Sequence, residues 1–253
     1  MNKVDKTEKE IVKQPILFLF KSMNQEHVDG SMKNGRFCFS HPSVFSGWEG
    51  KDSAQYDKWE GHGAHGLRHL YVAPYTKGET QPPPMDKWTK IADETIVHFE
   101  SDAAKHTPIC CFRAIRSGDL LFDKERRNAY FPLHEIADRI RNEFHHDAYI
   151  LVEATPFLER MRKSVPCCYT GAVIYQDAMN EPPFSLDKEY QIIAEQLFRK
   201  DEKFAWQNEY RIALAPTEES PVFVEIGSIE DIACCGSLID CDYAIRIDLN
   251  RLC

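Results

Sequence analysis

Apolar residues follow one another without interruption at 16–20, close to the start of the chain. A run of this kind is typical of a β-strand that is covered on both faces. A short helical segment is expected from 24 or 25 to 32, and Asn34-Gly35 ends it as a C-cap or tight turn. Apolar and polar residues then alternate at 36–40, which predicts a second strand that ends before His41-Pro42. The chain is therefore expected to begin with a strand, a helix and a strand.

Apolar residues that recur at helical spacing predict the helices of the middle of the chain. The spacing after Asp86, a favourable N-cap, predicts a helix from 86 to about 104. Helices are also expected from Pro132 to 144, from Pro156 to 163 and from Ser185 to 198. Apolar segments between and after these helices predict strands at 109–115, 148–154, 168–176, 221–226 and 243–247.

One further strand, expected at 207–214, has the pattern that bears most directly on function. Its apolar residues alternate with polar ones and are expected to face the core. The opposite face carries three strong polar groups: Gln207, Glu209 and Arg211. Such groups are costly on a buried sheet face unless they meet partners or a ligand. The strand at 221–226 is expected to pair with this one through a turn at 217–220.

Helices and strands are mixed without strict alternation, which indicates an α+β fold with mixed, largely antiparallel sheets and packed helices. Residues 1–14 are charged and are expected to be flexible, and 15–253 are expected to form a single domain. Residues 43–85, which are rich in Gly, His and Trp, are expected to form a long loop. Long loops of this kind are usually binding loops or lids, so we expect this one to cover the polar face of the strand at 207–214.

The composition is that of an ordinary globular protein of 253 residues, with 43% hydrophobic and 28% charged residues. The net charge of -9 disfavours tight generic binding of nucleic acid, although it is compatible with a local basic cleft. No apolar stretch approaches the length of a membrane span, and the charged start is unlike a signal peptide. We expect a cytoplasmic protein whose 9 cysteines, which lack a C-x-x-C spacing, are reduced.

Two stretches of the chain together resemble a known family. The first is the strand with Lys21, the helix, Asn34-Gly35 and the strand that leads to Ser40; the second is 206–212, which reads Trp-Gln-Asn-Glu-Tyr-Arg-Ile. Together they resemble the bacterial domain of unknown function 2971 family, whose members often open with a basic strand and close with a Trp…Glu-Tyr-Arg strand. The same arrangement is similar to an ADP-ribosyltransferase core, which ends in a Gln-x-Glu or Glu-x-Glu strand. Lys21 stands where such proteins usually carry Arg or His.

The resemblance implies NAD-dependent ADP-ribosyl transfer or NAD cleavage, in the setting of a bacterial toxin or phage-defence effector. It makes Glu209 and Gln207 the catalytic residues. As the nicotinamide–ribose bond breaks, positive charge builds up on the sugar, and a carboxylate beside the ribose stabilises that charge. Glu209 is expected to supply the carboxylate, and Gln207 is expected to orient the acceptor nucleophile. NAD is then the expected substrate, and no metal is expected.

The remaining residues of the implied site are expected to bind NAD: Lys21, Ser40, Tyr75 and Arg211. Lys21 is expected to hold a phosphate or ribose oxygen, and Ser40 to support the catalytic carboxylate by a hydrogen bond. An aromatic residue of the long loop, Tyr75 or Trp48, is expected to stack on nicotinamide. Arg211 is expected to brace the catalytic carboxylate or a loop.

Two other functions remain open at this point. The same fold can serve as a catalytically silent module that binds a ligand or a protein, because a fold does not determine a function. The other alternative is a metal-dependent hydrolase, which requires at least three of His62, His65, His69 and a carboxylate to converge at coordinating distance. The partners expected are a nucleotide-like small molecule and an acceptor macromolecule that the sequence does not identify.

Overall fold

The computed structural model of the protein describes residues 14–46, 60–74, 78, 81–123, 125, 128–165, 169–177, 196–239 and 244–248. Its α-helices are α2 (Gln25–Asn34), α3 (Pro42–Ser46), α4 (Asp102–Lys105), α5 (His134–Phe144) and α6 (Ala154–Ser164). Its 3-10 turns are η1 (Met85–Lys87), η2 (Ser117–Asp119) and η4 (Glu202–Gln207). Its strands are β1 (Ile16–Met23), β2 (Arg36–Phe39), β3 (Gly63–Val72), β4 (Thr89–Phe99), β5 (Ile109–Arg116), β6 (Leu121–Asp123), β7 (Asn128–Phe131), β8 (Ala148–Glu153), β9 (Tyr169–Ala172), β10 (Ile174–Gln176), β11 (Arg199–Asp201), β12 (Glu209–Ala213), β13 (Val222–Glu225), β14 (Ala233–Ser237) and β15 (Ile245–Asp248).

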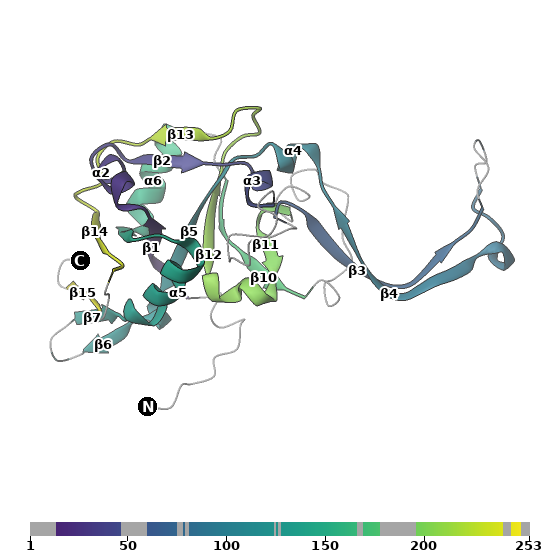
Figure 1. Cartoon of the computed structure of the whole chain (residues 1–253), viewed down its shortest axis with the longest axis horizontal. Coiled ribbons are helices and arrows are strands. Elements are labelled where there is room, and N and C mark those ends of the chain that lie inside the picture. The colour runs from purple at the N-terminus through teal and green to yellow at the C-terminus, as the bar shows by residue number, and fades with distance from the viewer. Residues whose placement is uncertain are drawn as a thin grey trace.

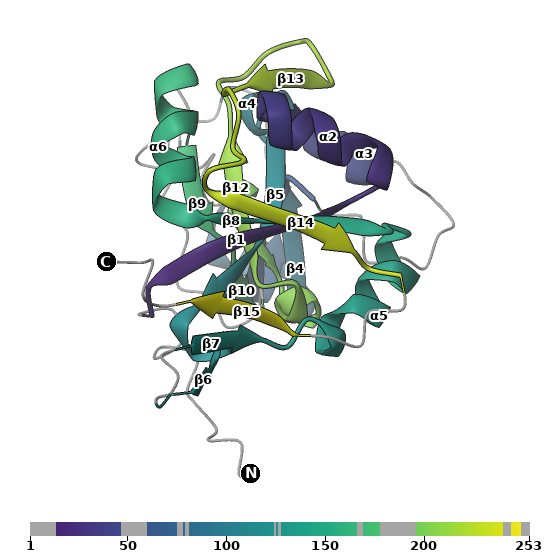
Figure 2. The ribbon, with the colours of Figure 1, turned by 90° about the vertical axis from the view of Figure 1, so that its left-hand side faces the viewer.

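The largest sheet has 6 strands in the order β14-β8-β1-β5-β12-β9. Every neighbouring pair in it is antiparallel, and the parallel pair β10–β11 lies outside it. The expected α+β class with mostly antiparallel sheets is confirmed. Strand β1 lies near the middle of the sheet, where both faces are covered, and this explains its uninterrupted apolar run (Figure 2).

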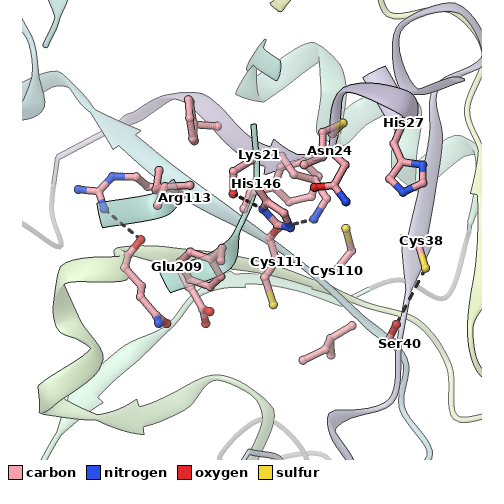
Figure 3. Close-up of a pocket in the computed structure, with 18 of the residues that line it drawn as sticks. Lys21, Asn24, His27, Cys38, Ser40, Cys110, Cys111, Arg113, His146 and Glu209 are labelled. Carbon is pink, nitrogen blue, oxygen red and sulfur yellow. Dashed lines mark hydrogen bonds between the residues drawn. The ribbon is translucent and has the colours of Figure 1, made fainter. Parts of the chain in front are cut away.

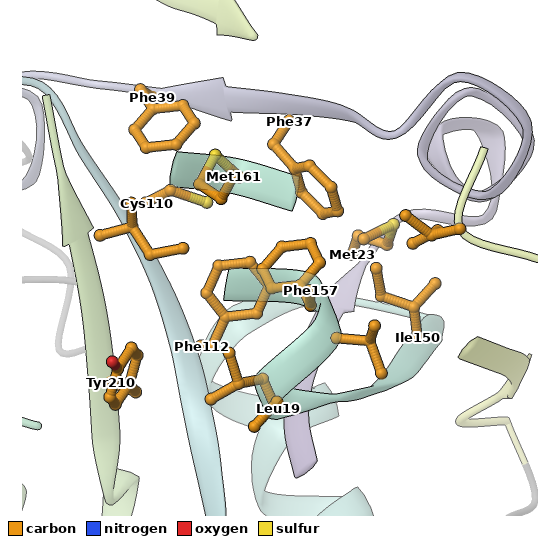
Figure 4. Close-up of a cluster of buried hydrophobic side chains, with 14 of the residues drawn as sticks. Leu19, Met23, Phe37, Phe39, Cys110, Phe112, Ile150, Phe157, Met161 and Tyr210 are labelled. Carbon is orange, nitrogen blue, oxygen red and sulfur yellow. The ribbon is translucent and has the colours of Figure 1, made fainter. Parts of the chain in front are cut away.

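One face of this sheet packs against α2, β2 and α6 (Figure 4). Its centre is an aromatic cluster in which Phe112 of β5 lies 5.7 Å from Phe37 of β2 and 5.3 Å from Phe157 of α6, measured between ring centroids. Each of these rings is almost fully buried, and burial of a Phe side chain stabilises a fold by about 1.5–3 kcal/mol. The cluster therefore fixes β2 and α6 to β5.

The other face packs against α5 and a 3-stranded sheet, β15-β7-β6. Phe20 of β1 stacks on Tyr149 of β8, with 5.2 Å between the ring centroids, and Ile140 of α5 belongs to the same cluster. Figure 2 shows α2 and α6 on one side of β1 and β8, and α5 with β7 and β15 on the other. Because side chains alternate along a strand, the neighbours Leu19 and Phe20 enter different cores.

The helix predicted from 86 to about 104 is wrong, because most of this segment is the strand β4. It pairs with β3 in an antiparallel ribbon, from Gly63 opposite Phe99 to Val72 opposite Thr89, with a shift of register between Leu70 and Tyr71. Figure 1 shows the ribbon standing away from the body of the molecule. β-Branched residues such as Ile91 are frequent in β4 and favour extended backbone, so strand pairing prevails over an apolar spacing that also fits a helix.

The predicted loop at 43–85 is therefore irregular only in part, since β3 occupies 63–72. Trp48, Tyr75 and most of the helix expected at 185–198 lie outside the described residues. The expected pairing of 221–226 with the central strand is also wrong, because β13 pairs with β2. Both edges of β12 are occupied, by β5 and β9, so the strand that follows it must pair elsewhere.

The start of the chain agrees with its prediction. Gly35 ends α2 with the left-handed backbone angle φ 58°, and its N–H donates to the carbonyl of Gly30. A side chain cannot replace the hydrogen there, because a Cβ on Gly35 would lie 2.2 Å from the carbonyl oxygen of Gly227. Within the described residues, no helix has the length and apolar character needed to cross a membrane.

Candidate functional site

A cavity of about 430 Å³ lies where β1 and β5 separate. The pairing of these strands ends at Phe20 and Arg113, although β1 continues along β8 to Met23. Lys21 spans the opening, because its Nζ donates a hydrogen bond of 3.0 Å to the carbonyl of Cys111 on β5. Figure 3 shows Lys21 and His146 on one side of the opening, and Cys38 and Ser40 at its edge.

Four of the residues predicted from the sequence line this cavity: Lys21, Ser40, Gln207 and Glu209. They come from β1, from the bridge that pairs Ser40 with Ile109, from η4 and from β12. The structure therefore brings together groups that are up to 188 positions apart in the chain, from Lys21 to Glu209. Tyr75 lies outside the described residues.

Two details of the predicted site need correction. Gln207 ends η4 and does not share a strand face with Glu209, because Asn208 adopts a left-handed conformation with φ 47° and β12 begins only after it. The second concerns Ser40, whose hydroxyl lies 3.9 Å from the Cys38 sulfur, whereas the carboxylate of Glu209 is held by Arg211 and Lys200. Gln207 and Glu209 nevertheless face a common partner, since Lys200 Nζ lies 3.0 Å from the Gln207 Oε1 and 3.4 Å from the Glu209 Oε1.

Arg211 lies beneath the cavity as the centre of a buried ion-pair network. Its guanidinium donates to both oxygens of Glu60, at 2.6 and 3.0 Å, and to the Oε2 of Glu209, at 2.6 and 2.9 Å. Lys200 Nζ completes the network, 3.2 Å from the Glu60 Oε2. The side chains of Arg211, Glu60, Lys200 and Glu209 are only 0%, 4%, 5% and 13% exposed. Two cations thus balance two carboxylates, and a fully buried Arg211 braces Glu209.

The pairing controls the ionisation of the buried groups. Burial by itself would raise the pKa of Glu60, but the charges of Arg211 and Lys200 outweigh burial and lower that pKa to about 2. Burial disfavours the charged form of Arg211, but Glu209 and Glu60 raise its pKa well above its usual value. Both groups are therefore charged at neutral pH, as a salt-bridged network requires.

Lys21 and His146 lie together on another side of the cavity (Figure 3). Burial and the nearby Lys21 ammonium lower the pKa of His146 to about 4, so its imidazole is neutral at neutral pH. Its Nδ1 lies 2.9 Å from the hydroxyl of Ser22. Burial raises the pKa of Cys111 to about 12, which keeps that thiol protonated and makes it a poor nucleophile. Within the described residues no carboxylate forms an ion pair with Lys21, which donates to a carbonyl and lies 5.3 Å from the ring centroid of Phe112.

The histidines proposed as metal ligands lie on or next to the ribbon strand β3. His62 Nε2 is 4.0 Å from Glu100, and His69 Nδ1 is 3.7 Å from Asp93, so these two rings meet different carboxylates. In the part of the chain that the structure describes, no group of 3 or more His, Cys, Asp or Glu side chains is placed to hold a metal ion.

Sequence reasoning missed several residues of the site: Glu60, Arg113, His146, Lys200 and Trp206. Glu60 follows a stretch without periodic pattern, and its partner Arg211 is 151 positions away. No local signal in the sequence links the two. The acidic and basic residues of such a network become recognisable only when a fold brings them together.

Comparisons of the chain with protein-family models, with curated proteins and with solved structures found no match in any of the three. The resemblance to the domain of unknown function 2971 family and to ADP-ribosyltransferases therefore rests on the residues quoted for it.

Proposed function

We propose that the protein breaks the bond between nicotinamide and ribose in NAD and passes the ADP-ribosyl group to an acceptor or to water. One observation carries the proposal: Lys21, Ser40, Gln207 and Glu209 come from separate segments of the chain and line one cavity. The resemblance to ADP-ribosyltransferases assigns these same four residues to catalysis and NAD binding. Cavities with a few converging polar groups are the usual sites of small-molecule chemistry.

In the proposed reaction the bond between the ribose C1′ and the nicotinamide nitrogen breaks, and its electron pair leaves with neutral nicotinamide. C1′ forms a new bond to an acceptor atom or to a water oxygen, which gives up a proton. Glu209 stabilises the positive charge of the sugar, because a fixed carboxylate in a site with little water interacts strongly with developing charge. Arg211 and Lys200 hold that carboxylate in place. Gln207 orients the nucleophile, and Lys21 binds a phosphate or ribose oxygen.

The proposal is tested by comparing NAD consumption, measured as released nicotinamide, in the wild type and in Glu209→Gln. The variant retains a hydrogen-bonding group but loses the charge, and we expect turnover to fall by about 10²–10³. Its fold is expected to survive, because Arg211 keeps its contacts with Glu60. Glu225→Gln on the exposed strand β13 is the matched control and should leave turnover unchanged. A wild type that never consumes NAD, or a Glu209→Gln variant with undiminished turnover, contradicts the proposal.

A second candidate, a catalytically silent binding module, is favoured by one specific observation. Arg211 engages the Oε2 of Glu209 and Lys200 approaches its Oε1, so the charge of this carboxylate is already balanced. Calorimetry with ADP-ribose separates the candidates. Binding without turnover of NAD supports the silent module, whereas binding together with Glu209-dependent turnover supports the enzyme.

A further inference from the structure

Three rings follow one another along one wall of the cavity: Trp206, Phe144 and His146. The ring centroids of Trp206 and Phe144 are 5.9 Å apart and tilted by 45°, and those of Phe144 and His146 are 6.0 Å apart and stacked within 19°. Both separations lie in the range in which aromatic pairs attract each other. We call these three residues the aromatic wall.

Trp206 has one face covered and held by the protein. The guanidinium carbon of Arg139, on α5, lies 3.7 Å from the centroid of the Trp206 ring, in cation–π geometry. The Nε of Arg139 donates to the Glu143 carboxylate at 2.6 Å, in a partly exposed ion pair one turn along the same helix. Arg113 holds the backbone from below by donating to the Trp206 carbonyl. The indole therefore has one face against Arg139, and it lines the cavity.

The wall carries no charge of its own at neutral pH. Phe144 and Trp206 are neutral, and the imidazole of His146 is neutral as well, with its Nδ1 in contact with Ser22. Figure 3 shows His146 next to Lys21, so the end of the wall lies beside the cation that spans the strand gap. A ligand that fits both features has a flat apolar ring joined to a polar or anionic part.

We propose that the aromatic wall stacks on the planar heteroaromatic ring of a nucleotide. This inference rests on the proposed function in so far as the ligand is a nucleotide. It assigns to Trp206 the stacking on a ligand ring that the sequence analysis expects of Tyr75 or Trp48. Stacking of a base on an aromatic side chain is worth about 1–3 kcal/mol by alanine substitution. At 1.4 kcal/mol per factor of ten, this is a roughly 5- to 150-fold difference in affinity.

Nicotinamide and adenine both carry such a ring, and the experiment distinguishes them. The chain has 4 tryptophans, so a triple variant, Trp48→Phe, Trp59→Phe and Trp88→Phe, leaves Trp206 as the sole indole. This folded variant is titrated with AMP, with nicotinamide mononucleotide and with ribose 5-phosphate, which has no ring. We expect the emission of Trp206 to change with at least one ring-bearing probe and to stay constant with ribose 5-phosphate.

Affinity for the responding probe is then measured by calorimetry in single variants of the wild type. Trp206→Leu is expected to weaken binding at least about fivefold, whereas Trp206→Phe keeps a ring and should stay within about threefold. Trp88→Phe is the matched control, because Trp88 follows η1, just before β4, and does not line the cavity. If Trp206→Leu does not fold, Phe144→Leu takes its place with the same expected loss.

Two results overturn the inference: no ring-bearing probe binds at millimolar concentration, or a probe binds with no change in Trp206 emission and with equal affinity for Trp206→Leu. Failure of the proposed function looks different. If the protein binds AMP through Trp206 but never consumes NAD, the stacking role of the aromatic wall is supported and the proposed enzymatic function is refuted. If the protein consumes NAD and Trp206→Leu leaves KM unchanged, the proposed enzymatic function is supported and the stacking role of the aromatic wall is refuted.

Discussion

Replacement of Glu60 by Gln removes one charge from the buried network while it keeps the size of the side chain. Glu60 contributes both of its oxygens to Arg211 and one of them to Lys200. In the variant these two cations retain a single carboxylate, that of Glu209. An imbalance of charge in a buried site is costly, because little water is present to solvate the excess.

The pKa of Glu60 gives the magnitude of this effect. Folding lowers it from 4.5 to about 2. Each pKa unit corresponds to about 1.4 kcal/mol, so ionised Glu60 stabilises the fold by about 3 kcal/mol at neutral pH. Loss of one partner from a buried ion pair costs about 3–5 kcal/mol, which agrees with this value. For a chain of this size, 3 kcal/mol lowers the melting temperature by roughly 6–12 °C.

The pH dependence has a definite sign. Because the pKa of Glu60 is lower in the folded state, its contribution is fully present above the unfolded value of 4.5 and is lost as the pH falls through about 2. We therefore expect the difference in the free energy of unfolding between the wild type and Glu60→Gln to be constant from pH 7 to pH 5. Below pH 4.5 the difference should shrink.

The assay is urea unfolding followed by circular dichroism at several pH values. Asp29→Asn is a suitable control, because the ion pair of Asp29 with Lys33 is exposed and surface pairs contribute little to stability. If Glu60→Gln unfolds at the same urea concentration as the wild type at pH 7, the network does not stabilise the fold. A difference that does not change between pH 5 and pH 2.5 means that the cost comes from packing and not from the charge of Glu60.

Two further predictions concern the backbone. Gly35→Ala is expected to lower the free energy of unfolding, measured with urea, by more than about 1 kcal/mol, because φ is 58° and the new Cβ would lie 2.2 Å from the Gly227 carbonyl oxygen. Gly30→Ala, in α2 with no atom within 4 Å of its Cβ, should leave that free energy unchanged or raise it. Equal effects of the two substitutions would contradict this reading. Amide hydrogens in the distal ribbon of β3 and β4 are expected to exchange faster than those of β5 and β12, because a two-stranded ribbon is marginally stable in water, and slow exchange throughout the ribbon would refute this.

The sequence predicts best those elements whose faces meet a core. The run at 16–20 and the alternation at 36–40 predict β1 and β2 because each lies against buried neighbours. The sequence predicts a helix at β4 and a loop at β3 because both faces of the ribbon are largely exposed, as Ile91 is at 56%. Because neither face of β4 is buried, its apolar and polar residues do not alternate. Its β-branched residues are the only feature of the sequence that indicates a strand there.

Within the candidate site, the residues predicted from the sequence are those that the resemblance names. Lys21, Ser40, Gln207 and Glu209 were named in this way, and all line the cavity. Glu60 and Lys200 follow no motif. Glu60 meets Arg211 across 151 positions, and Lys200, although only 9 positions from Glu209, lies on the separate strand β11. Ion pairs of this kind form only in the folded structure, and no short stretch of the sequence indicates which residues will meet.

The position of β12 between β5 and β9 also has a consequence for the synthesis of the chain. During translation β1, β5 and β8 leave the ribosome well before Glu209, at about 5–20 residues per second. Until β12 arrives, β5 has one edge without a partner, and unpaired strand edges attract other chains. The loop that closes when Arg211 meets Glu60 spans 151 positions, and contacts of such long range slow folding. The strand that carries Glu209 is thus also the one that covers the free edge of β5, and a chain truncated before it should aggregate.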